Sequence, residues 1–380
     1  MPLPQPATGS ELVVSERELE FSFWPVSRTT RRYGLGSRIY ASDPWTIIRR
    51  SVKNRLPQTQ QKPALALIEQ AEDFFDAAGS GIRAAKPLLI YYSFLNLAKA
   101  FLLTSGERAV VDDAMHGVRD RLHPPPNNTE LLGAYLSAQN GPARHAPPGN
   151  QKIQIFEELH RALAGANLSA SNFDLPVLMP QVLPGHRLWA AGATTTERFL
   201  ALDKIEIVND TAAHDLRLRF FVKRDDLKRI NLTHQQLLQH TRLAADFREV
   251  TSYHAGSICI EQTNPLHYGH RATDHVQELV ETIKARLWRT VLKVAPYRKY
   301  YLYACPPTEQ IQILPQILSI YAVTYYLGSI TRYRPHHFDT IIDGRFGPLI
   351  ESFLIDQPSQ FTYLMASEFA LQEVAKAEIA

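Results

Sequence analysis

The hydrophobic pattern of this 380-residue chain changes twice along its length, and this change constrains the fold more than any other feature. Before about residue 185, apolar residues recur with the period of an α-helix, as in "KPALALIEQAEDFFDAAG". From 185 to 305 they alternate in the manner of strands, as in "RFLALDKIEIVND". From residue 309 the helical period returns. The sequence therefore predicts a mainly α fold with an inserted α+β segment, and a helical core built from the N- and C-terminal parts of the chain.

These changes of pattern divide the chain into segments. Residues 1–40 are predicted to form an irregular basic arm, and 41–184 a helical region. Residues 185–305 are predicted to form the α+β insertion with a small sheet. The C-terminal helical region, 306–380, is expected to pack on 41–184. A chain of this length has enough residues for two domains or for one core with a large insertion.

The composition is that of an ordinary globular protein, with 45% hydrophobic and 21% charged residues. Its two cysteines are far apart, which argues against a disulfide scaffold or a cysteine zinc site. The N-terminus has no basic segment followed by an apolar run. The longest apolar stretch, "PLLIYYSFLNLAKAFLL", is interrupted by polar residues. We therefore expect a cytoplasmic protein with no membrane partner.

A basic stretch near the C-terminus, "SITRYRPHHFDTIIDGRFG", offers the clearest candidate chemistry. Arg332 and His337 have an R-x4-H spacing, and Arg334 and His336 lie between them. RNA cleavage without a metal needs a base for the 2′-hydroxyl proton and a cation for the phosphate. Histidine and arginine supply these two groups. Alternatively, the arginines complement the dipole at the end of one helix, and Pro335 begins the next.

Charge is distributed unevenly between the two ends of the chain. Residues 28–55 contain eight basic residues against the single acid Asp43, with aromatic residues interleaved, whereas 339–380 contain seven acids against two basic residues. One interpretation is a nucleic-acid surface, with RNA favoured over DNA. The other is that the two ends complement each other, within or between subunits. The candidate nucleic-acid-binding residues are Arg28, Arg31, Arg32, Arg38, Arg49, Arg50 and Arg334.

A polar set interrupts the otherwise apolar stretch at 86–104. Ser93, Asn96 and Lys99 are spaced three apart and are predicted to share a helix face. Buried polar groups need partners, so this face is either a hydrogen-bond network between helices or part of a site. The sequence contains no GxxxxGK[ST], GxSxG or HExxH motif, and no metal or cofactor is predicted.

Several stretches resemble the bacterial YaaC-like family. They are "DPWTIIRRSVKNRLPQ", "IEQAEDFFDAA", "KPLLIYYSFLNLAKAFLL" and "ITRYRPHHFDTIIDGRFGPLIESFLIDQPSQFTYLM". The resemblance implies a soluble, mostly helical bacterial protein. A weaker resemblance, carried by the R-x4-H spacing alone, is to the HEPN helical ribonucleases of toxin and phage-defence systems. The sequence departs from that pattern at Tyr333, where a polar residue is usual, and at Pro335, which interrupts the helix.

Two hypotheses follow for the function. The first is a nucleic-acid-directed, HEPN-like, metal-independent ribonuclease in stress or phage defence, with Arg332 holding phosphate, His337 as base and His336 in support. Sites of that kind are composite, so a homodimer is expected. The second is a non-catalytic helical adaptor or regulatory subunit that binds nucleic acid or a protein partner.

Overall fold

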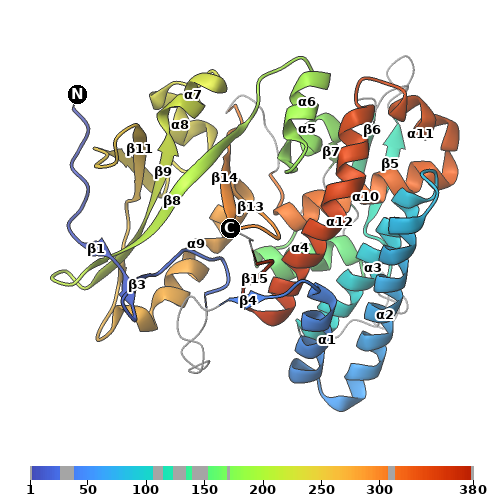
Figure 1. The fold of residues 1–380 in the computed structure, drawn as a ribbon, viewed down its shortest axis with the longest axis horizontal. Helices are drawn as coiled ribbons and strands as arrows, with labels where there is room; N and C mark the ends of the chain where they lie inside the picture. The colour runs from blue at the N-terminus through green and yellow to red at the C-terminus, as the bar shows by residue number, and fades with distance from the viewer. Residues whose placement is uncertain are drawn as a thin grey trace, which may run out of the picture. The chain divides into compact units, whose positions relative to one another are not determined.

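The structure is a computed structural model that describes residues 2–25, 38–105, 114–122, 134–138, 153–168, 172–306 and 313–377. The chain divides into two compact units (Figure 1). The sheet unit consists of Met1–Tyr40, Thr196–Ile311 and Leu371–Ala380, and the helical unit consists of Ala41–Thr195 and Gln312–Ala370. Each unit therefore combines segments that are far apart in the sequence.

The helical unit is built around α3 (Lys86–Thr104), because this helix is apolar on nearly every side. The ring of Phe94 on α3 stacks on Phe361 of α12 (Gly347–Ala370), with ring centroids 3.7 Å apart. α3 also packs against α2 (Gln58–Ser80) and α10 (Gln316–Tyr333). The remaining elements described in this unit are α1 (Pro44–Arg55), β5 (Val118–Leu122), β6 (Ala134–Ala138), α4 (Ile155–Ala164), β7 (Asn172–Asp174), α5 (Leu175–Leu178), η3 (Met179–Gln181), α6 (His186–Gly192) and α11 (Pro335–Ile342).

α3 is long and apolar enough to span a membrane by length and composition. However, 72% of its most apolar window is buried inside the protein, where α2, α10 and α12 pack against it. A helix that is apolar all round is also what the centre of a packed helical unit requires. The hydropathy of α3 is thus explained by its position in the core.

The sheet unit contains an antiparallel sheet of eight strands. Six of them follow the order β10–β11–β9–β8–β14–β13, and β1 and β12 pair with β8 and β9 respectively. A separate parallel pair joins the C-terminal β15 to β4. The elements described in this unit are β1 (Ser10–Glu11), β2 (Val13–Val14), β3 (Arg17–Glu18), β4 (Ile39–Tyr40), β8 (Phe199–Asp210), β9 (Asp215–Lys223), α7 (Arg224–Arg229), α8 (His234–His240), β10 (Phe247–Val250), β11 (Ser257–Gln262), β12 (Leu266–His267), η4 (Ala272–Asp274), α9 (Val276–Thr290), β13 (Val291–Val294), β14 (Lys299–Tyr303) and β15 (Val374–Ala375).

The two faces of this sheet differ in chemistry, because successive strand residues point to opposite sides. Ile205 of β8 lies opposite Phe220 of β9, and both are buried. Their neighbours Glu206 and Arg219 also face each other, and Arg219 faces Glu261 of β11 in turn. Arg219 Nε donates to Glu261 Oε2 at 2.7 Å. One face therefore carries apolar side chains, and the other carries a buried row of alternating charge.

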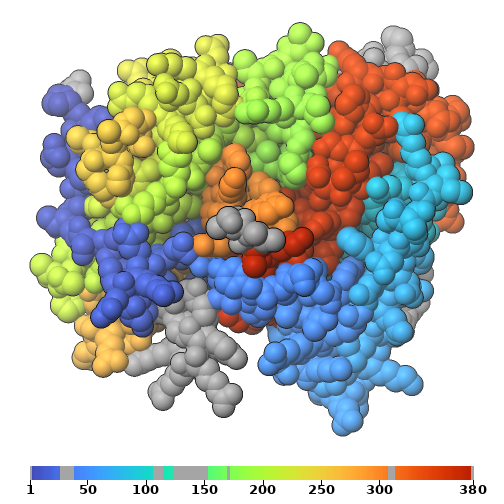
Figure 2. Space-filling model, viewed as in Figure 1, coloured from blue at the N-terminus to red at the C-terminus, as the bar shows by residue number. Residues whose placement is uncertain are grey.

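The N-terminal segment lies across this charged row. The N–H of Ala7 donates to both carboxylate oxygens of Glu261, at 3.2 and 3.1 Å, and its carbonyl oxygen accepts from Arg219. The hydroxyl of Thr8 donates to Asp210. In the space-filling view, the dark blue N-terminal residues lie against the gold and yellow-green part of the same unit (Figure 2). The backbone of Ala7 and the hydroxyl of Thr8 thus satisfy charges that burial would otherwise leave costly.

The prediction of a mainly α fold is wrong, because the sheet is too large: the fold is α+β. The sequence predicted a small sheet inside the insertion, but β1 of the supposedly irregular N-terminal arm joins it as well. Strands such as β1 and β12 have two residues each, too few to show an alternating pattern. They become strands because β8 and β9 offer them backbone partners, which is a tertiary effect.

Candidate functional site

The R-x4-H stretch forms the turn between α10 and α11. α10 ends at Tyr333, Arg334 is the cap of both helices, and Pro335 is the first residue of α11. His337 is buried, and its Nε2 lies 3.4 Å from the hydroxyl oxygen of Tyr326. Desolvation, and then the charges of Arg334 and His336, lower the pKa of His337. His337 is therefore held neutral inside the helical unit.

Arg332 has a different environment from His337. Its side chain is exposed, donates to the hydroxyl of Tyr92 at 3.0 Å, and lies 5.0 Å from the centroid of the Tyr333 ring. Among the described contacts, none joins Arg332 to His337. His336 is exposed, and its backbone carbonyl accepts from Thr340. The proline turn thus places the arginine at the surface and His337 in the core.

Arg334 ties this turn to β5. Its NH2 group lies 2.7 Å from Oδ2 of Asp120, whose Oδ1 accepts from the hydroxyl of Ser329 at 2.6 Å. The side chain is only 31% exposed. Asp120 is therefore an internal counter-ion, and the charge of Arg334 is largely used in fixing the α10–α11 turn.

A histidine that the sequence reading missed, His116, lies near Arg332. Its Nδ1 is hydrogen-bonded to the hydroxyl of Tyr91 on α3, and its ring lies 5.9 Å from that of Tyr325 on α10. Desolvation lowers the pKa of His116 most, followed by the positive charges of Lys99 and Arg332. The site thus brings together a neutral imidazole and two cationic side chains from three chain segments.

The backbone around His116 is fixed by α4. The N–H of Ile155 donates to the carbonyl of Met115 at 2.9 Å, and the N–H of Phe156 donates to that of His116 at 3.3 Å. Gly117 has a φ of +81°, and a Cβ atom there would lie 2.8 Å from the nitrogen of Phe156. Only glycine fits this turn without strain. In the sequence, the pair His116–Gly117 before β5 is the one local indication of this turn.

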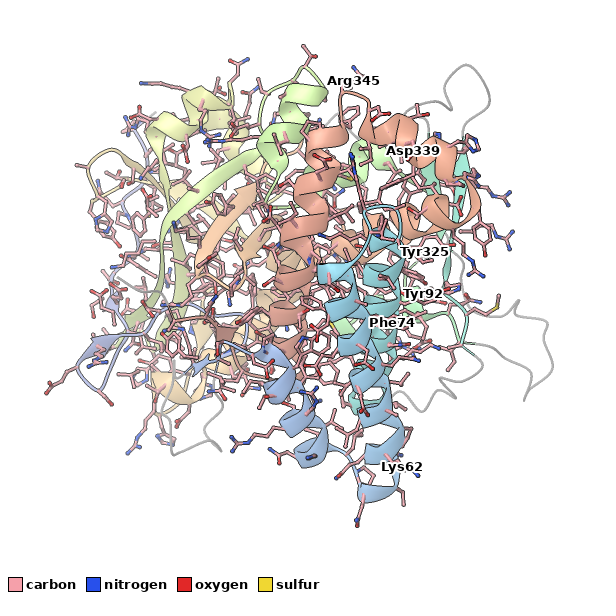
Figure 3. The ribbon with its side chains drawn as sticks, turned by 45° about the vertical axis from the view of Figure 1, so that its right-hand side comes forward. Lys62, Phe74, Tyr92, Tyr325, Asp339 and Arg345 are labelled. Atoms are coloured by element: carbon pink, nitrogen blue, oxygen red, sulfur yellow. The ribbon has the colours of Figure 1, made fainter. Side chains whose placement is uncertain are left out.

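Aromatic rings surround this group. Tyr91 contacts Tyr92 and Tyr325, with ring centroids 5.7 and 5.2 Å apart, and Tyr92 contacts Phe74 of α2 at 5.6 Å. Figure 3 shows Tyr325, Tyr92 and Phe74 following one another along this side of the helical unit. Gly328 allows α10 to approach α3 closely at this point, because a Cβ atom at residue 328 would lie 3.0 Å from the Cβ atom of Tyr91. We call Tyr91, Tyr92, Lys99, His116, Tyr325, Arg332 and Tyr333 the tyrosine–arginine site.

The predicted polar face of α3 is distributed among different environments. Ser93 is buried. Asn96 Nδ2 donates to Gln70 Oε1 on α2 at 2.7 Å, which is a hydrogen bond between helices. Lys99 is half-buried and acts on His116 through its charge. Only Lys99 of the three thus belongs to the tyrosine–arginine site.

The predicted basic surface of residues 28–55 is also divided. Arg28, Arg31 and Arg32 lie outside the described residues. Arg49 pairs with Glu72, and Arg50 is exposed on α1 of the helical unit.

Arg38 lies in the sheet unit, where its guanidinium group binds two carboxylates. Its Nε lies 2.9 Å from Glu373 and its NH2 2.6 Å from Glu20. Glu373 is buried and also binds Lys293, which is completely buried, at 2.7 Å. Arg38 therefore belongs to an internal ion network that holds β15 to this unit.

In the described part of the chain, no group of three or more His, Cys, Asp or Glu side chains is placed to hold a metal ion. The tyrosine–arginine site brings three kinds of chemical group together. It offers aromatic faces for stacking, cations for an anionic group and one neutral imidazole.

Fold and site together define an α+β protein with an aromatic and cationic surface on its helical unit. The chain matches the family model described as YaaC-like Protein over residues 27–369, so it belongs to the YaaC-like family. This confirms the resemblance found in the sequence. No curated protein and no solved structure matches the chain significantly.

Proposed function

We propose that this YaaC-like protein is nucleic-acid-directed and binds single-stranded RNA at the tyrosine–arginine site. The observation that carries the proposal is the exposed Arg332, which donates to the hydroxyl of Tyr92 and lies over the ring of Tyr333. Proteins that bind single strands combine aromatic side chains, on which bases stack, with cations that follow the phosphates. Tyr333 is 65% exposed and so has a face free for stacking.

The charges around the site favour an anionic ligand. Arg119 of β5 is exposed, and its charge acts on Tyr325. Lys99 and Arg332 act together on His116. The nearby carboxylate of Asp120 already binds Arg334. Three cationic side chains thus remain available for phosphate groups near the aromatic rings.

RNA is favoured over DNA because the site has polar groups beside its rings. The hydroxyl of Tyr92 and the imidazole of His116 can each form a hydrogen bond with a ribose 2′-hydroxyl, which distinguishes RNA from DNA. Single strands are favoured over duplexes, because bases must be unstacked to reach aromatic faces.

The test is fluorescence anisotropy of a labelled single-stranded RNA, with single-stranded DNA and duplex RNA of the same sequence as competitors. Tyr333→Ala should raise Kd about fivefold or more, since stacking on one ring contributes roughly 1–3 kcal/mol. Arg332→Ala should weaken binding and lower the slope of log K against log salt by about one.

The matched control is Arg345→Ala. Arg345 is also exposed and lies 5.1 Å from an aromatic ring, that of Phe346. Figure 3 shows it away from Tyr92 and Tyr325. Equal loss of affinity in Arg345→Ala and Arg332→Ala, or no binding by the wild type, contradicts the proposal. Absence of RNA binding would favour the adaptor hypothesis with a protein partner. The homodimer, the cytoplasmic location and the defence role stay predictions from the sequence.

A further inference from the structure

Only one ring nitrogen of His116 is used in the hydrogen bonds of the described residues. Its Nδ1 is hydrogen-bonded to the hydroxyl of Tyr91, while Nε2 has no hydrogen-bond partner among the described residues. The residue is exposed, although the rings of Tyr91 and Tyr325 flank the imidazole. In the tautomer in which Nδ1 donates its proton to Tyr91, Nε2 carries the free lone pair of the ring. This is the arrangement that a general base needs.

The groups that face His116 favour its neutral form. Tyr91 and Lys99 come from α3, and Tyr325 and Arg332 come from α10. The charged members of this set are both cations, and they lower the pKa of the imidazole together with desolvation. A carboxylate would instead favour the imidazolium form. His116 is thus neutral at pH 7 and remains able to accept a proton.

The cations beside His116 suit a phosphate group. Arg332 offers a planar fork of donors to phosphate oxygens, and Lys99 offers a point charge. A phosphodiester held by Arg332 would therefore lie beside the free Nε2 atom. His337, which the R-x4-H spacing suggested as the base, is buried against Tyr326 instead.

On the basis of the RNA-binding function proposed above, we propose that this site cleaves single-stranded RNA without a metal ion, with His116 as general base. Nε2 takes the proton of a 2′-hydroxyl, and the 2′-oxygen forms a bond to phosphorus. The bond from phosphorus to the 5′-oxygen breaks, and that oxygen takes a proton from solvent. The imidazolium returns its proton to solvent. The products are a 2′,3′-cyclic phosphate and a 5′-hydroxyl, so atoms and electrons balance without a co-reactant.

In this reaction Tyr91 is a positioning residue. Its hydroxyl orients the imidazole through Nδ1, while its ring packs against Tyr92 and Tyr325. Tyr91→Phe keeps the ring and removes only the hydroxyl. It should reduce the cleavage rate less than His116→Ala does. It should also change the acid limb of the pH profile, which a purely structural role would not move.

The experiment incubates the full-length protein with a fluorescent single-stranded RNA in EDTA and resolves the fragments by electrophoresis. His116→Ala should lower the cleavage rate by about 10²–10⁴-fold, the usual contribution of a general base. Binding, measured separately by anisotropy, should change little. His270→Ala, which removes an exposed histidine of the sheet unit, should cleave like the wild type. A substrate with 2′-deoxyribose at the cleaved position should be resistant.

The pH profile gives an independent readout. The pKa of His116 is lowered from 6.5. Ionisation of His116 should therefore leave kcat/KM unchanged near pH 7, and kcat/KM should fall as the pH is lowered below 6.5.

The outcomes separate this inference from the proposed function. RNA that is bound but not cleaved overturns the cleavage inference and leaves the binding proposal standing, whereas RNA that is not bound overturns both. Cleavage that survives His116→Ala also overturns the inference. If His337→Ala abolishes that activity, the base is His337 instead.

Discussion

The ion network around Glu373 allows a stringent test of the sheet unit. Glu373→Gln keeps the size of the side chain but removes the carboxylate that lies 2.7 Å from the ammonium group of Lys293. Lys293 is completely buried and Glu373 is 1% exposed, so water cannot replace the lost charge. Breaking one partner of a buried pair costs about 3–5 kcal/mol, because the other charge stays buried. We expect a loss of unfolding free energy in that range.

A second substitution separates this cause from general damage. Lys293→Met keeps most of the apolar stem and removes the buried ammonium group. The double variant Glu373→Gln/Lys293→Met should therefore recover at least about 1–2 kcal/mol relative to Glu373→Gln alone. Arg38 keeps a carboxylate partner in both variants, because it also binds Glu20.

The assay is urea unfolding of the full-length chain, with hydrogen exchange of the β13 and β14 amides to locate the loss. Burial alone would raise the pKa of Glu373, but Lys293, Arg38 and Arg298 outweigh it and hold the pKa below 4.5. This stabilisation is present above pH 4.5 and is lost as the pH falls through the lower pKa of the folded state. The difference in unfolding free energy between the wild type and Glu373→Gln should therefore become smaller as the pH falls below 4.5. A loss below about 1 kcal/mol at pH 7, or a further loss on adding Lys293→Met, refutes the reasoning.

Three further substitutions test the packing and the caps. Gly328→Ala should cost about 1–3 kcal/mol in urea unfolding, because the new methyl group meets Tyr91; unchanged stability would contradict the close approach of α10 to α3. Asp43→Ala should cost about 1 kcal/mol, since its carboxylate accepts from the N–H groups of Trp45 and Thr46. Asp43→Asn is its control and should cost less. Arg219→Met should cost roughly 3–5 kcal/mol and increase hydrogen exchange in the N-terminal segment; protection as in the wild type would show that Arg219 does not hold that segment.

Part of the fold was predictable because a long helix repeats its hydrophobic pattern over several turns. The apolar helix at 86–104 and the break at Pro335 both appear in the structure as the sequence indicated. The family was also identified from the two helical ends. These features depend on residues within one or two turns of each other, so a single sequence contains them.

The candidate site was predictable only in part. Arg332 and Lys99 were singled out from the sequence, but their placement near one imidazole was not foreseen, because α3 and α10 are more than 200 residues apart. His116 lies in a loop with no periodic pattern, so it had no local signal beyond the glycine that follows it. The spacing of Ser93, Asn96 and Lys99 on α3 did not indicate that the three side chains meet different neighbours.

By itself the sequence determined the long helices α2 and α3, the strand pattern of β8, and which family the chain belongs to. The predicted helical region 41–184 also contains the strands β5, β6 and β7, which the sequence did not predict. The tertiary structure decided the rest. Two-residue strands become part of an eight-stranded sheet because β8 and β9 pair with them. His337 becomes a core residue and His116 a site residue because burial and charge depend on neighbours that are distant in the chain. Helical periodicity is a local property, whereas the environment of a side chain is set by packing between elements.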